Sequence, residues 1–304
     1  LKQIPQALDL RSHILQNFEA ATIAEDQEEI DSRMNMVIVG GGPTGVEVAG
    51  ALGELKISVL PADYPELDFR KMNIILIEGD SRLLNAMSEK SSERSQRYLK
   101  KFDVKVMLKT LIKDYDGKVA HLDNGKSIPT HTLIWAAGVQ GNAPMGLSDG
   151  ALERGRILVD EYSKVQGCEN VYAIGDIAAM KSDDYPQGHP MLAPVAIQQG
   201  QNLAENLKRM ITGKEPKPFI YNDKGSMATV GRNKAVVDMA GGVRVGGFMA
   251  WIIWMFIHLI SIIGFRNRLI VFSNWVWNYF TYDRGTRLII RKFIPKNVLK
   301  ERAL

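Results

Sequence analysis

The sequence predicts an α/β protein with a parallel sheet, and three neighbouring segments carry that prediction. Met34 to Val39 is a short apolar run, Thr44 to Leu55 is rich in helix-forming residues, and Met72 to Glu78 is a second apolar run. This strand, helix, strand order is typical of a βαβ unit, in which a helix joins two parallel strands. The chain has 304 residues, of which 45% are apolar and 24% charged, enough for about two globular domains. The composition excludes a disordered tail and a disulfide-stapled miniprotein.

The segments on either side of this unit are predicted from periodicity and turn residues. The opening stretch as far as Ile30 is predicted to be one helix, because its apolar residues recur at spacings of three and four. Residues 56–71, with Pro61 and Pro65, are predicted to form a loop or an insertion. Lys105 to Lys113 and Lys118 to Leu122 are predicted to be strands joined by a turn.

Two more short strands and one helix are predicted further along the chain. His131 to Ala137 and Asn170 to Ile174 are apolar runs that end at Gly138 and Gly175. Val195 to Ile211 is predicted to be a helix that Gly213 ends. A single cysteine cannot form an internal disulfide, which favours a reducing, intracellular setting.

The C-terminal end differs in charge from the rest of the chain. Residues 266–304 contain nine Lys or Arg and two acidic residues, net +7, which leaves net −3 of the total +4 for residues 1–265. Four of the five tryptophans fall within 27 residues beside this basic segment. A tryptophan cluster next to a basic cluster is typical of a membrane-facing surface, and we interpret the charge in this way and not as nucleic-acid binding.

The apolar segment before the basic residues allows three interpretations. Val245 to Phe265 has no charged residue across 21 positions, which is long enough for one transmembrane helix. Glycines and His258 dilute the run, and Leu269 to Phe280 is too short to cross back, so we favour two segments lying in the membrane interface. A single span and an oligomer interface remain alternatives. His258 is assigned no chemistry.

The turn after the first strand carries a nucleotide-binding pattern. Gly40, Gly42 and Gly45 have the G-x-G-x-x-G spacing directly after a strand and at the start of a helix. The first glycine permits the tight turn, the second lets the backbone approach a pyrophosphate, and the third allows the helix to pack closely on the strand. The helix N-terminus then offers unpaired N–H groups to the phosphates.

Two acidic residues lie near this turn. Glu78 ends the second strand, where a carboxylate can bind the adenosine ribose and repel a 2′-phosphate, so NADH is favoured over NADPH. The alternative is an exposed glutamate at the end of a strand. Glu47 lies in the first turn of the helix, either as a favourable charge at the helix N-terminus or as a residue near the nicotinamide.

Two later strings share the form of an apolar strand followed by a glycine. They are LIWAAGV, which contains Ala137 and Gly138, and NVYAIGDIA, which contains Gly175 and Asp176. Each could be a plain strand-to-helix turn. In this order behind a nucleotide-binding turn, they resemble the flavoprotein pyridine nucleotide reductases with two dinucleotide-binding domains. The resemblance implies that Asp176 binds the flavin ribityl chain and that the WAAG segment lies near the nicotinamide and the flavin.

The C-terminal strings beginning FIYNDKGSMATVGRNKAVVD and GGFMAWIIWMFIHLISIIGF resemble the type II, non-proton-pumping NADH:quinone oxidoreductases. This resemblance implies two Rossmann-like dinucleotide-binding domains and a membrane-associating helical region at the C-terminus. That family begins with an FAD-binding βαβ unit that has its own glycine motif, and no such motif precedes Gly40 here. We therefore expect the chain to be a C-terminal portion with an incomplete FAD-binding domain.

This sequence departs from the quinone-side motif of that family at one position. The string APVAIQQGQ has Pro194 in place of the first glutamine, while Gln198 and Gln199 remain. The resemblance makes Gln198 and Lys224 candidates for quinone contacts, although either could be a surface or turn residue.

The resemblance, together with the motifs above, gives the predicted sites: Glu47, Gln198 and Lys224 as catalytic residues, and Gly40, Gly42, Gly45, Glu78, Ala137, Gly138, Gly175, Asp176, Ala196 and Gln199 as cofactor-binding residues. No metal site is predicted.

By this resemblance the complete protein would transfer electrons from NADH through FAD to a membrane quinone in respiratory electron transport, without pumping protons. It would be peripheral on the cytoplasmic side of the cell inner membrane, attached to anionic lipid, and a homodimer is compatible with it. The alternatives are a soluble flavoprotein reductase of the disulfide or ferredoxin type, and a non-catalytic NADH-binding membrane protein.

We predict a lead-in helix of the FAD domain at 1–34, an NADH-binding domain at 35–139, the C-terminal part of the FAD domain at 140–215 and a membrane-anchoring region at 216–304.

Overall fold

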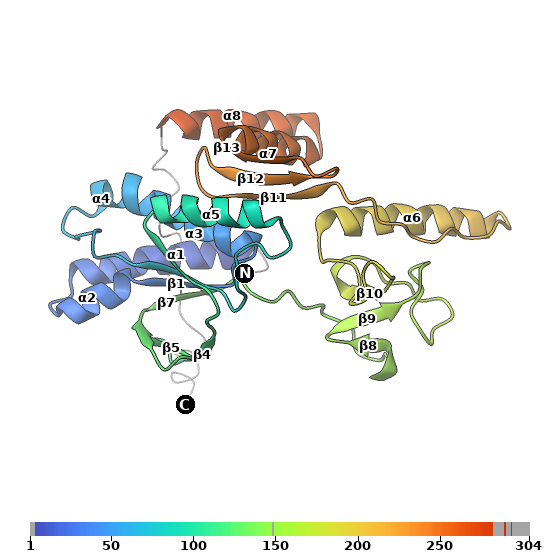
Figure 1. The fold of residues 1–304 in the computed structure, drawn as a ribbon, viewed down its shortest axis with the longest axis horizontal. Coiled ribbons are helices and arrows are strands. Elements are labelled where there is room, and N and C mark those ends of the chain that lie inside the picture. Colours follow the sequence, from blue (N-terminus) through green and yellow to red (C-terminus); the bar gives the residue numbers. More distant parts are fainter. Residues whose placement is uncertain (1–3, 148, 282–288, 290–292, 294–304) are drawn as a thin grey trace. The chain divides into compact units, whose positions relative to one another are not determined.

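The computed structural model describes residues 4–147, 149–281, 289 and 293. Contacts divide the chain into two compact units, one of residues 1–137 and 225–304 and the other of residues 138–224 (Figure 1). The sequence-based boundaries at 139/140 and 215/216 lie near these breaks, but residues 216–224 belong to the second unit and the chain after them returns to the first. The functional roles assigned to those segments stay predictions. The α/β class predicted from the sequence is confirmed.

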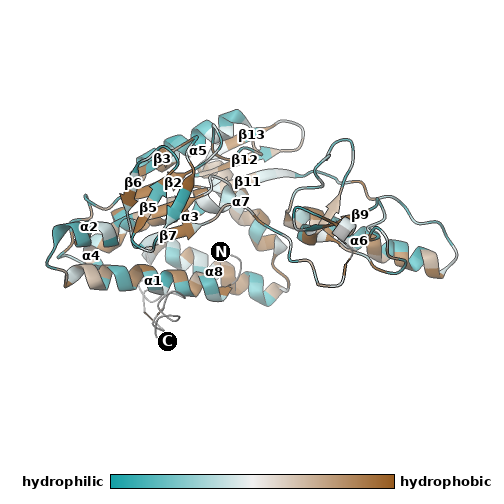
Figure 2. Ribbon diagram, turned by 90° about the horizontal axis from the view of Figure 1, so that it is seen from below, coloured by the Kyte–Doolittle hydropathy of each residue, from teal (hydrophilic) through white to brown (hydrophobic). Residues whose placement is uncertain are grey.

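A four-stranded parallel sheet forms the centre of the first unit. Its strand order is β3 (Val104–Met107), β2 (Ile74–Ile77), β1 (Met36–Val39) and β7 (Thr132–Trp135). Every residue of β1 and β2 is buried, as expected for parallel strands with both faces covered. Figure 2 shows brown, hydrophobic strands beside helices whose outward turns are teal. The carboxyl ends of β1 and β2 therefore meet at one edge of the sheet, where the glycine-rich turn leaves β1.

The helices around this sheet differ from the prediction at two places. The opening stretch is two helices and not one, because Asp26 caps the second by accepting bonds from the backbone N–H groups of Glu28 and Glu29. Residues 56–71 are also not simply a loop: one helix runs on to Ser58, and Pro61 lies in the first turn of a short further helix, where proline is tolerated. A polar helix that we did not predict, α5, follows its cap Ser88. The helices are α1 (Ile4–Thr22), α2 (Gln27–Met34), α3 (Pro43–Ser58), α4 (Leu60–Asp63) and α5 (Glu89–Lys101).

The predicted strand from Lys105 to Lys113 is wrong, because it is two strands in two sheets. Lys109 adopts a left-handed conformation with φ +51°, and Thr110 donates its N–H to the carbonyl of Glu78, so the chain turns out of the parallel sheet. It then forms a small antiparallel sheet of β4 (Ile112–Tyr115), β5 (Val119–Leu122) and β6 (Ser127–Pro129).

The late part of the chain adds an antiparallel sheet and two helices to the first unit. These are β11 (Gly225–Thr229), β12 (Ala235–Met239), β13 (Arg244–Gly247), α7 (Phe248–Ser261) and α8 (Phe265–Thr281). The sheet packs on α3 and α5, and α7 packs on the sheet. Asp238 on β12 accepts bonds from the N–H and hydroxyl of Ser88 and from the hydroxyl of Ser91, and so caps α5. None of the helices in the described residues is both long and apolar enough to cross a membrane.

Helix α3 lies close to the backbone of both its neighbours because glycines line its buried faces. A Cβ on Gly45 would lie 1.8 Å from the carbonyl oxygen of Gly40, and one on Gly50 would lie 2.8 Å from the backbone nitrogen of Gly231. A Cβ on Gly53 would lie 2.6 Å from the Cβ of Phe102. The helix therefore contacts the nucleotide-side turn at one glycine and the turn between β11 and β12 at another.

The second unit contains a three-stranded sheet and one long helix. The predicted strand from Asn170 to Ile174 is wrong: Tyr172 makes only an isolated bridge to Lys164, and the strand begins after the Gly-Asp pair. The reason is Gly175, whose φ of +72° turns the backbone before the strand can start. The elements are η1 (Asp149–Ala151), β8 (Leu152–Glu153), β9 (Arg156–Val159), η2 (Gly175–Ile177), β10 (Ala178–Met180) and α6 (Ala193–Ile211).

Replacing Gly50 by alanine in the full-length protein should destabilise it by about 1 to 3 kcal/mol, because the methyl group would force the β11–β12 turn away from α3. Alanine normally stabilises the interior of a helix by up to about 1 kcal/mol over glycine. Gly200 in α6 is the matched control, since the nearest atom to its added Cβ lies 3.5 Å away. Urea unfolding measures both free energies. A Gly50→Ala variant as stable as Gly200→Ala would contradict the close backbone contact.

Candidate functional site

The glycine-rich turn places its first glycine where no side chain could fit. Gly40 has φ +107°, and a Cβ there would lie 2.8 Å from the backbone nitrogen of Ala137. Its N–H donates to the carbonyl of Ile77 at 2.8 Å, so the turn is tied to the end of β2. Ala137 therefore lies against the turn, and Gly138 follows with φ +67° and open space around it.

The second and third glycines have different surroundings. Gly42 is the N-cap of α3, and nothing lies within 4 Å of the position that a Cβ would take. Gly45 lets the first turn of α3 pack on the carbonyl of Gly40. The space beside Gly42 at the N-terminus of α3 is therefore open, and the N–H groups there can receive a phosphate.

The carboxylate of Glu78 is joined to this turn. One oxygen, Oε2, accepts a short hydrogen bond from the N–H of Gly41, and Oε1 accepts from the N–H of Asp80 at 2.8 Å. The backbone of Glu78 continues the sheet, with its N–H donating to the carbonyl of Met107 at 2.9 Å. A half-buried carboxylate at the end of β2 and beside the glycine turn is the arrangement that binds a ribose in dinucleotide sites. The residues of the first unit thus fit a dinucleotide.

The predicted position of Glu47 in the first turn is wrong, because α3 begins at Pro43 and Glu47 is its fifth residue. Its Oε1 accepts the backbone N–H of Thr229 on β11 at 3.3 Å, a contact between residues 182 positions apart. Burial raises the pKa of the Glu47 carboxyl above its ordinary value, although the Thr229 N–H and the charge of His258 on α7 oppose this. Glu47 therefore lies between the nucleotide-side helix and the C-terminal sheet, with a carboxyl group able to hold a proton closer to neutral pH than an exposed glutamate can.

The second unit brings together four of the predicted cofactor-binding residues. Gln199 is 1% exposed, and its Oε1 accepts the N–H of Gly175 at 2.7 Å, so its side chain holds the Gly-Asp turn in place. A Cβ on Gly175 would lie 3.2 Å from that of Ala196, in the first turn of α6. Asp176 is exposed at this turn and free to accept bonds from a polyol. These residues fit the side of a flavin site that the resemblance implies.

The two remaining predicted residues, Gln198 and Lys224, have different surroundings. The amide of Gln198 pairs with the backbone of Asn222, donating to its carbonyl and accepting its N–H, both at 3.0 Å. Lys224 is exposed and precedes β11 directly. Contact with a quinone stays a prediction for both, and Gln198 would first have to release Asn222.

Arg156 is a residue beside the predicted flavin-side turn that sequence reasoning missed. Its guanidinium donates to the carbonyls of Ala178 and His189, the latter at 2.9 Å, and so joins the first residue of β10 to the chain that follows the strand. Burial lowers the pKa of Arg156, while the charge of Asp176 acts in the opposite direction. Arg156 begins β9, the strand directly before the Gly-Asp turn, and no sequence motif marks it, so only the fold reveals that its charge acts on Asp176.

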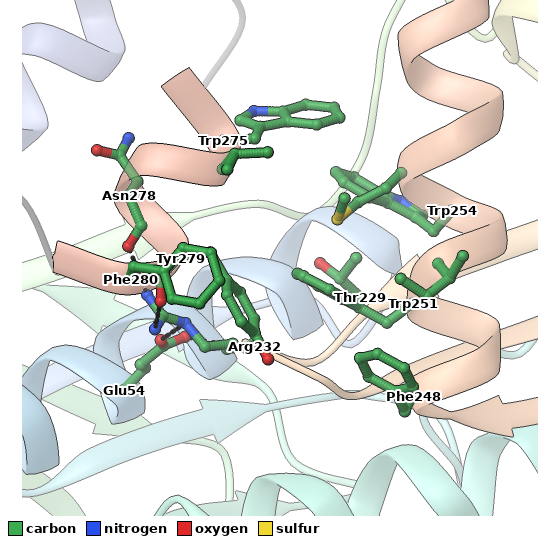
Figure 3. A pocket seen from close by; sticks show the side chains of 14 residues that line it. Glu54, Thr229, Arg232, Phe248, Trp251, Trp254, Trp275, Asn278, Tyr279 and Phe280 are labelled. Atoms are coloured by element: carbon green, nitrogen blue, oxygen red, sulfur yellow. Dashed lines mark hydrogen bonds and ion pairs between the residues drawn. The ribbon is translucent and has the colours of Figure 1, made fainter. Parts of the chain in front are cut away.

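A second missed feature is an aromatic cavity of about 460 Å³ in the first unit (Figure 3). It lies between the β11–β12 turn, α3, α7 and α8, and Thr229 and Met255 also face it. Its aromatic lining residues are Phe248, Trp251, Trp254, Trp275, Tyr279 and Phe280.

Arg232 closes one side of this cavity. Its Nη1 and Nη2 donate to the carbonyls of Tyr279 and Asn278, in the last turn of α8, at 2.8 and 3.1 Å. Its Nε lies 3.2 Å from a carboxylate oxygen of Glu54 on α3, and the guanidinium lies over the Tyr279 ring (Figure 3). A cation at a helix C-terminus is favourable for that helix, so Arg232 links α3 to α8 electrostatically.

Comparison with known proteins agrees with this geometry. Residues 2–200 match the model of the pyridine nucleotide-disulphide oxidoreductase family, which is more than half of the chain. The chain belongs to the pyridine nucleotide-disulphide oxidoreductase family. Residues 224–282 match the NDH2 C-terminal domain, which places the chain in the type II NADH dehydrogenase branch of that family and confirms the resemblance found in the sequence.

Individual members of the family share sequence with more than nine tenths of the chain. The type II NADH:quinone oxidoreductase NdhA of Mycobacterium tuberculosis is 35% identical, over 97% of this chain and 64% of its own length. An internal alternative NAD(P)H-ubiquinone oxidoreductase of Solanum tuberosum mitochondria is 30% identical, over 91% of this chain and 59% of its own length. This chain therefore spans about three fifths of the length of these relatives.

One solved structure has the same fold. NDH2 from Plasmodium falciparum, in complex with NADH, superposes with a TM-score of 0.82 at 20% identity, over 95% of this chain and 74% of the other. The likeness covers nearly the whole chain and shows the fold alone.

Glu78→Gln should weaken NADH binding about 10-fold to 100-fold in the full-length protein while NADPH binding changes less, because a charged acceptor for a ribose hydroxyl is worth about 1.5 to 3 kcal/mol. Nicotinamide fluorescence titration gives both dissociation constants. Glu66→Gln, an exposed glutamate outside the site, is the control. Unchanged selectivity between NADH and NADPH would remove Glu78 from the ribose site.

Proposed function

We propose that the intact protein oxidises NADH and passes the electrons through FAD to a membrane quinone, without pumping protons. The observation that carries the proposal is the open glycine turn with the Glu78 carboxylate bonded to it, in a chain of the type II NADH dehydrogenase branch. The relatives named as NADH:quinone oxidoreductases support quinone as the acceptor.

In this proposal the first unit binds and orients NADH. The N–H groups at the start of α3 hold the pyrophosphate beside Gly42, and Glu78 accepts bonds from the ribose hydroxyls. Ala137 and Gly138 leave room for the nicotinamide end, because Gly138 has no neighbour within 4 Å of a Cβ position. Glu47, with its raised pKa, lies where it can hold a proton for the reaction.

The second unit contributes the flavin side. Asp176 binds the ribityl chain, and Gln199 and Ala196 fix the Gly175 turn that presents it. Bound FAD would accept hydride from NADH and reduce the quinone, and the residues around it would supply orientation and electrostatics. Gln198 and Lys224 are the proposed quinone contacts.

Attachment to the membrane surface is proposed for α7 and α8. Their exposed apolar side chains include Ile263 and Phe265 at the turn between them, which are 88% and 79% exposed. Arg266 is exposed next to them and suits an anionic headgroup, while the other basic residues of 266–304, apart from Arg268, lie outside the described residues. A peripheral position on the cytoplasmic face of the inner membrane and a homodimer complete the proposal.

The decisive experiment measures NADH oxidation by the purified full-length flavoprotein with a short-chain quinone as acceptor. We expect quinone-dependent turnover that is lost when FAD is removed and restored when it is added back. Turnover with ferricyanide alone, and none with the quinone, would contradict the quinone assignment.

Membrane attachment is tested by flotation with vesicles that contain anionic phosphatidylglycerol. Ile263→Asp combined with Phe265→Asp should release most of the protein, because each carboxylate would enter the apolar interface. Ile211→Asp is the matched control, an isoleucine 86% exposed in the second unit. Equal flotation of both variants would remove the α7–α8 turn from the membrane surface.

A further inference from the structure

The segment between Glu78 and the cap of α5 packs directly on the glycine-rich turn, and the proposed function leaves it without a role. We call residues 79–87 the ribose-side loop. Leu84 in this loop donates its N–H to the carbonyl of Gly41 at 2.8 Å. A Cβ on Gly41 would lie 2.6 Å from the side chain of Leu83, which is 1% exposed. The loop is therefore in contact with the turn that is proposed to hold the pyrophosphate.

Gly41 is held at both of its backbone groups. Its N–H donates to the carboxylate of Glu78, and its carbonyl accepts the N–H of Leu84. The strand-end carboxylate and the loop thus meet at one residue of the turn. Because these groups are in direct contact, a displacement of the loop must also displace the turn or the carboxylate.

Arg82 closes the ribose-side loop on itself. Its Nε donates to Oδ1 of Asn85 at 3.0 Å, and its Nη2 donates to the carbonyl of Asn85 at 2.7 Å. Its Nη1 donates to the carbonyl of Met87 at 2.9 Å. A guanidinium is planar and presents its donors in a fixed fork, so it can bind these three acceptors only when they hold one arrangement. Arg82 therefore fixes the conformation of residues 82–87.

The same hydrogen bonds continue as far as Glu78. Asn85 donates its Nδ2 to Oδ2 of Asp80 at 3.0 Å, and the N–H of Asp80 donates to Oε1 of Glu78 at 2.8 Å. The carbonyl of Asp80 also accepts the N–H of Lys109 at 3.0 Å. A continuous chain of hydrogen bonds thus runs from the Arg82 guanidinium to the carboxylate that is proposed to bind the ribose.

The contacts of Arg82 differ from those of an arginine that binds NADPH. In dinucleotide sites an arginine near the strand-end acid can accommodate the 2′-phosphate. Three of the five N–H groups of Arg82 donate within its own loop instead. The carboxylates of Glu78 and Asp80 would also repel a phosphate at this place. The geometry therefore favours a role in ordering the loop over a role in binding a phosphate.

We propose that Arg82 is a positioning residue that determines the choice of dinucleotide. By holding the ribose-side loop, it keeps the Glu78 carboxylate where it can accept bonds from the ribose hydroxyls, so that a dinucleotide without a 2′-phosphate is preferred. Arg82 acts through Asn85 and Asp80 and does not touch the cofactor. This inference rests on the proposed function, in which the first unit binds NADH.

The test measures binding of ADP-ribose and of its 2′-phosphate to the full-length flavoprotein by isothermal titration calorimetry. These probes contain the adenosine half of NADH and of NADPH but no nicotinamide. Arg82→Gln should weaken binding of ADP-ribose about tenfold and change binding of the 2′-phosphate less than about twofold, because Glu78 loses its fixed position. In a Glu78→Gln background, Arg82→Gln should weaken ADP-ribose less than about twofold further, since both residues belong to one network.

A second variant separates the loop from the charge of Arg82. Asn85→Ala should reproduce the loss of preference, because it breaks the chain between Arg82 and Asp80 but keeps the guanidinium. Asn85 is exposed, so its truncation leaves the buried part of the loop intact. Lys109→Gln is the matched control: it removes an exposed positive charge beside the loop, while the bond from Lys109 to Asp80 is made by the backbone. This control should bind ADP-ribose as wild type does.

Four results would contradict the inference. Wild-type binding of both probes in Arg82→Gln shows that the loop does not need the guanidinium. Wild-type preference in Asn85→Ala, beside a loss in Arg82→Gln, shows that the guanidinium acts on the cofactor directly. An equal loss of both probes shows that the loop only maintains the fold of the turn. Fully additive losses from Arg82→Gln and Glu78→Gln show that Arg82 does not act through Glu78.

Binding of these probes requires neither hydride transfer nor a quinone, so the two proposals fail separately. If the variants lose the preference of wild type for ADP-ribose but wild type reduces no quinone, the proposed function fails and the role of Arg82 stands. If wild type reduces quinone with NADH but the variants keep its preference, the role of Arg82 fails and the proposed function stands.

Discussion

Helix α3 packs directly against the backbone of neighbouring segments on two of its faces. The arrangement of the first unit depends on this close packing. Gly45 meets the carbonyl of Gly40 and Gly50 meets the backbone at Gly231, with no room for a methyl group at either place. One helix therefore fixes both the phosphate-binding turn and the C-terminal sheet. Because protein interiors are closely packed, a shift of α3 at one face must be met by a shift at the other.

The residues that carry the proposed chemistry follow from this position. Gly42 caps α3, and Glu47 and Glu54 follow along the helix. Gly42 lies at the proposed phosphate site, Glu47 contacts Thr229 on β11, and Glu54 pairs with Arg232. The ion pair at Glu54 is half-buried and includes hydrogen bonds to the last carbonyls of α8, so it is stronger than an exposed surface pair. Through α3, the nucleotide turn and the apolar helices α7 and α8 belong to one packed body.

Local sequence was sufficient for β1, the glycine turn and most of α3, because short-range sterics determine each of them. It was insufficient for α5, because three of the four residues that this helix buries are serines and therefore give no apolar periodicity in the sequence. The partners of Glu47 and Arg232 could not be predicted, since they lie 182 and 47 positions away and no motif joins them. The glutamines at 198 and 199 were recognised by type, but the hydrogen bonds that position them depend on the folded turns at Asn222 and Gly175.

The distance in sequence between α3 and the sheet that covers it has a consequence for synthesis. Thr229 is made 182 residues after Glu47, so at about 5 to 20 residues per second the ribosome needs on the order of 10 to 40 seconds to supply the cover. The Gly40–Gly45 contact is local and can form at once. During this interval the glycine face of α3 and the carboxyl of Glu47 are exposed to solvent, and folding of the first unit is complete only when β11 and β12 arrive.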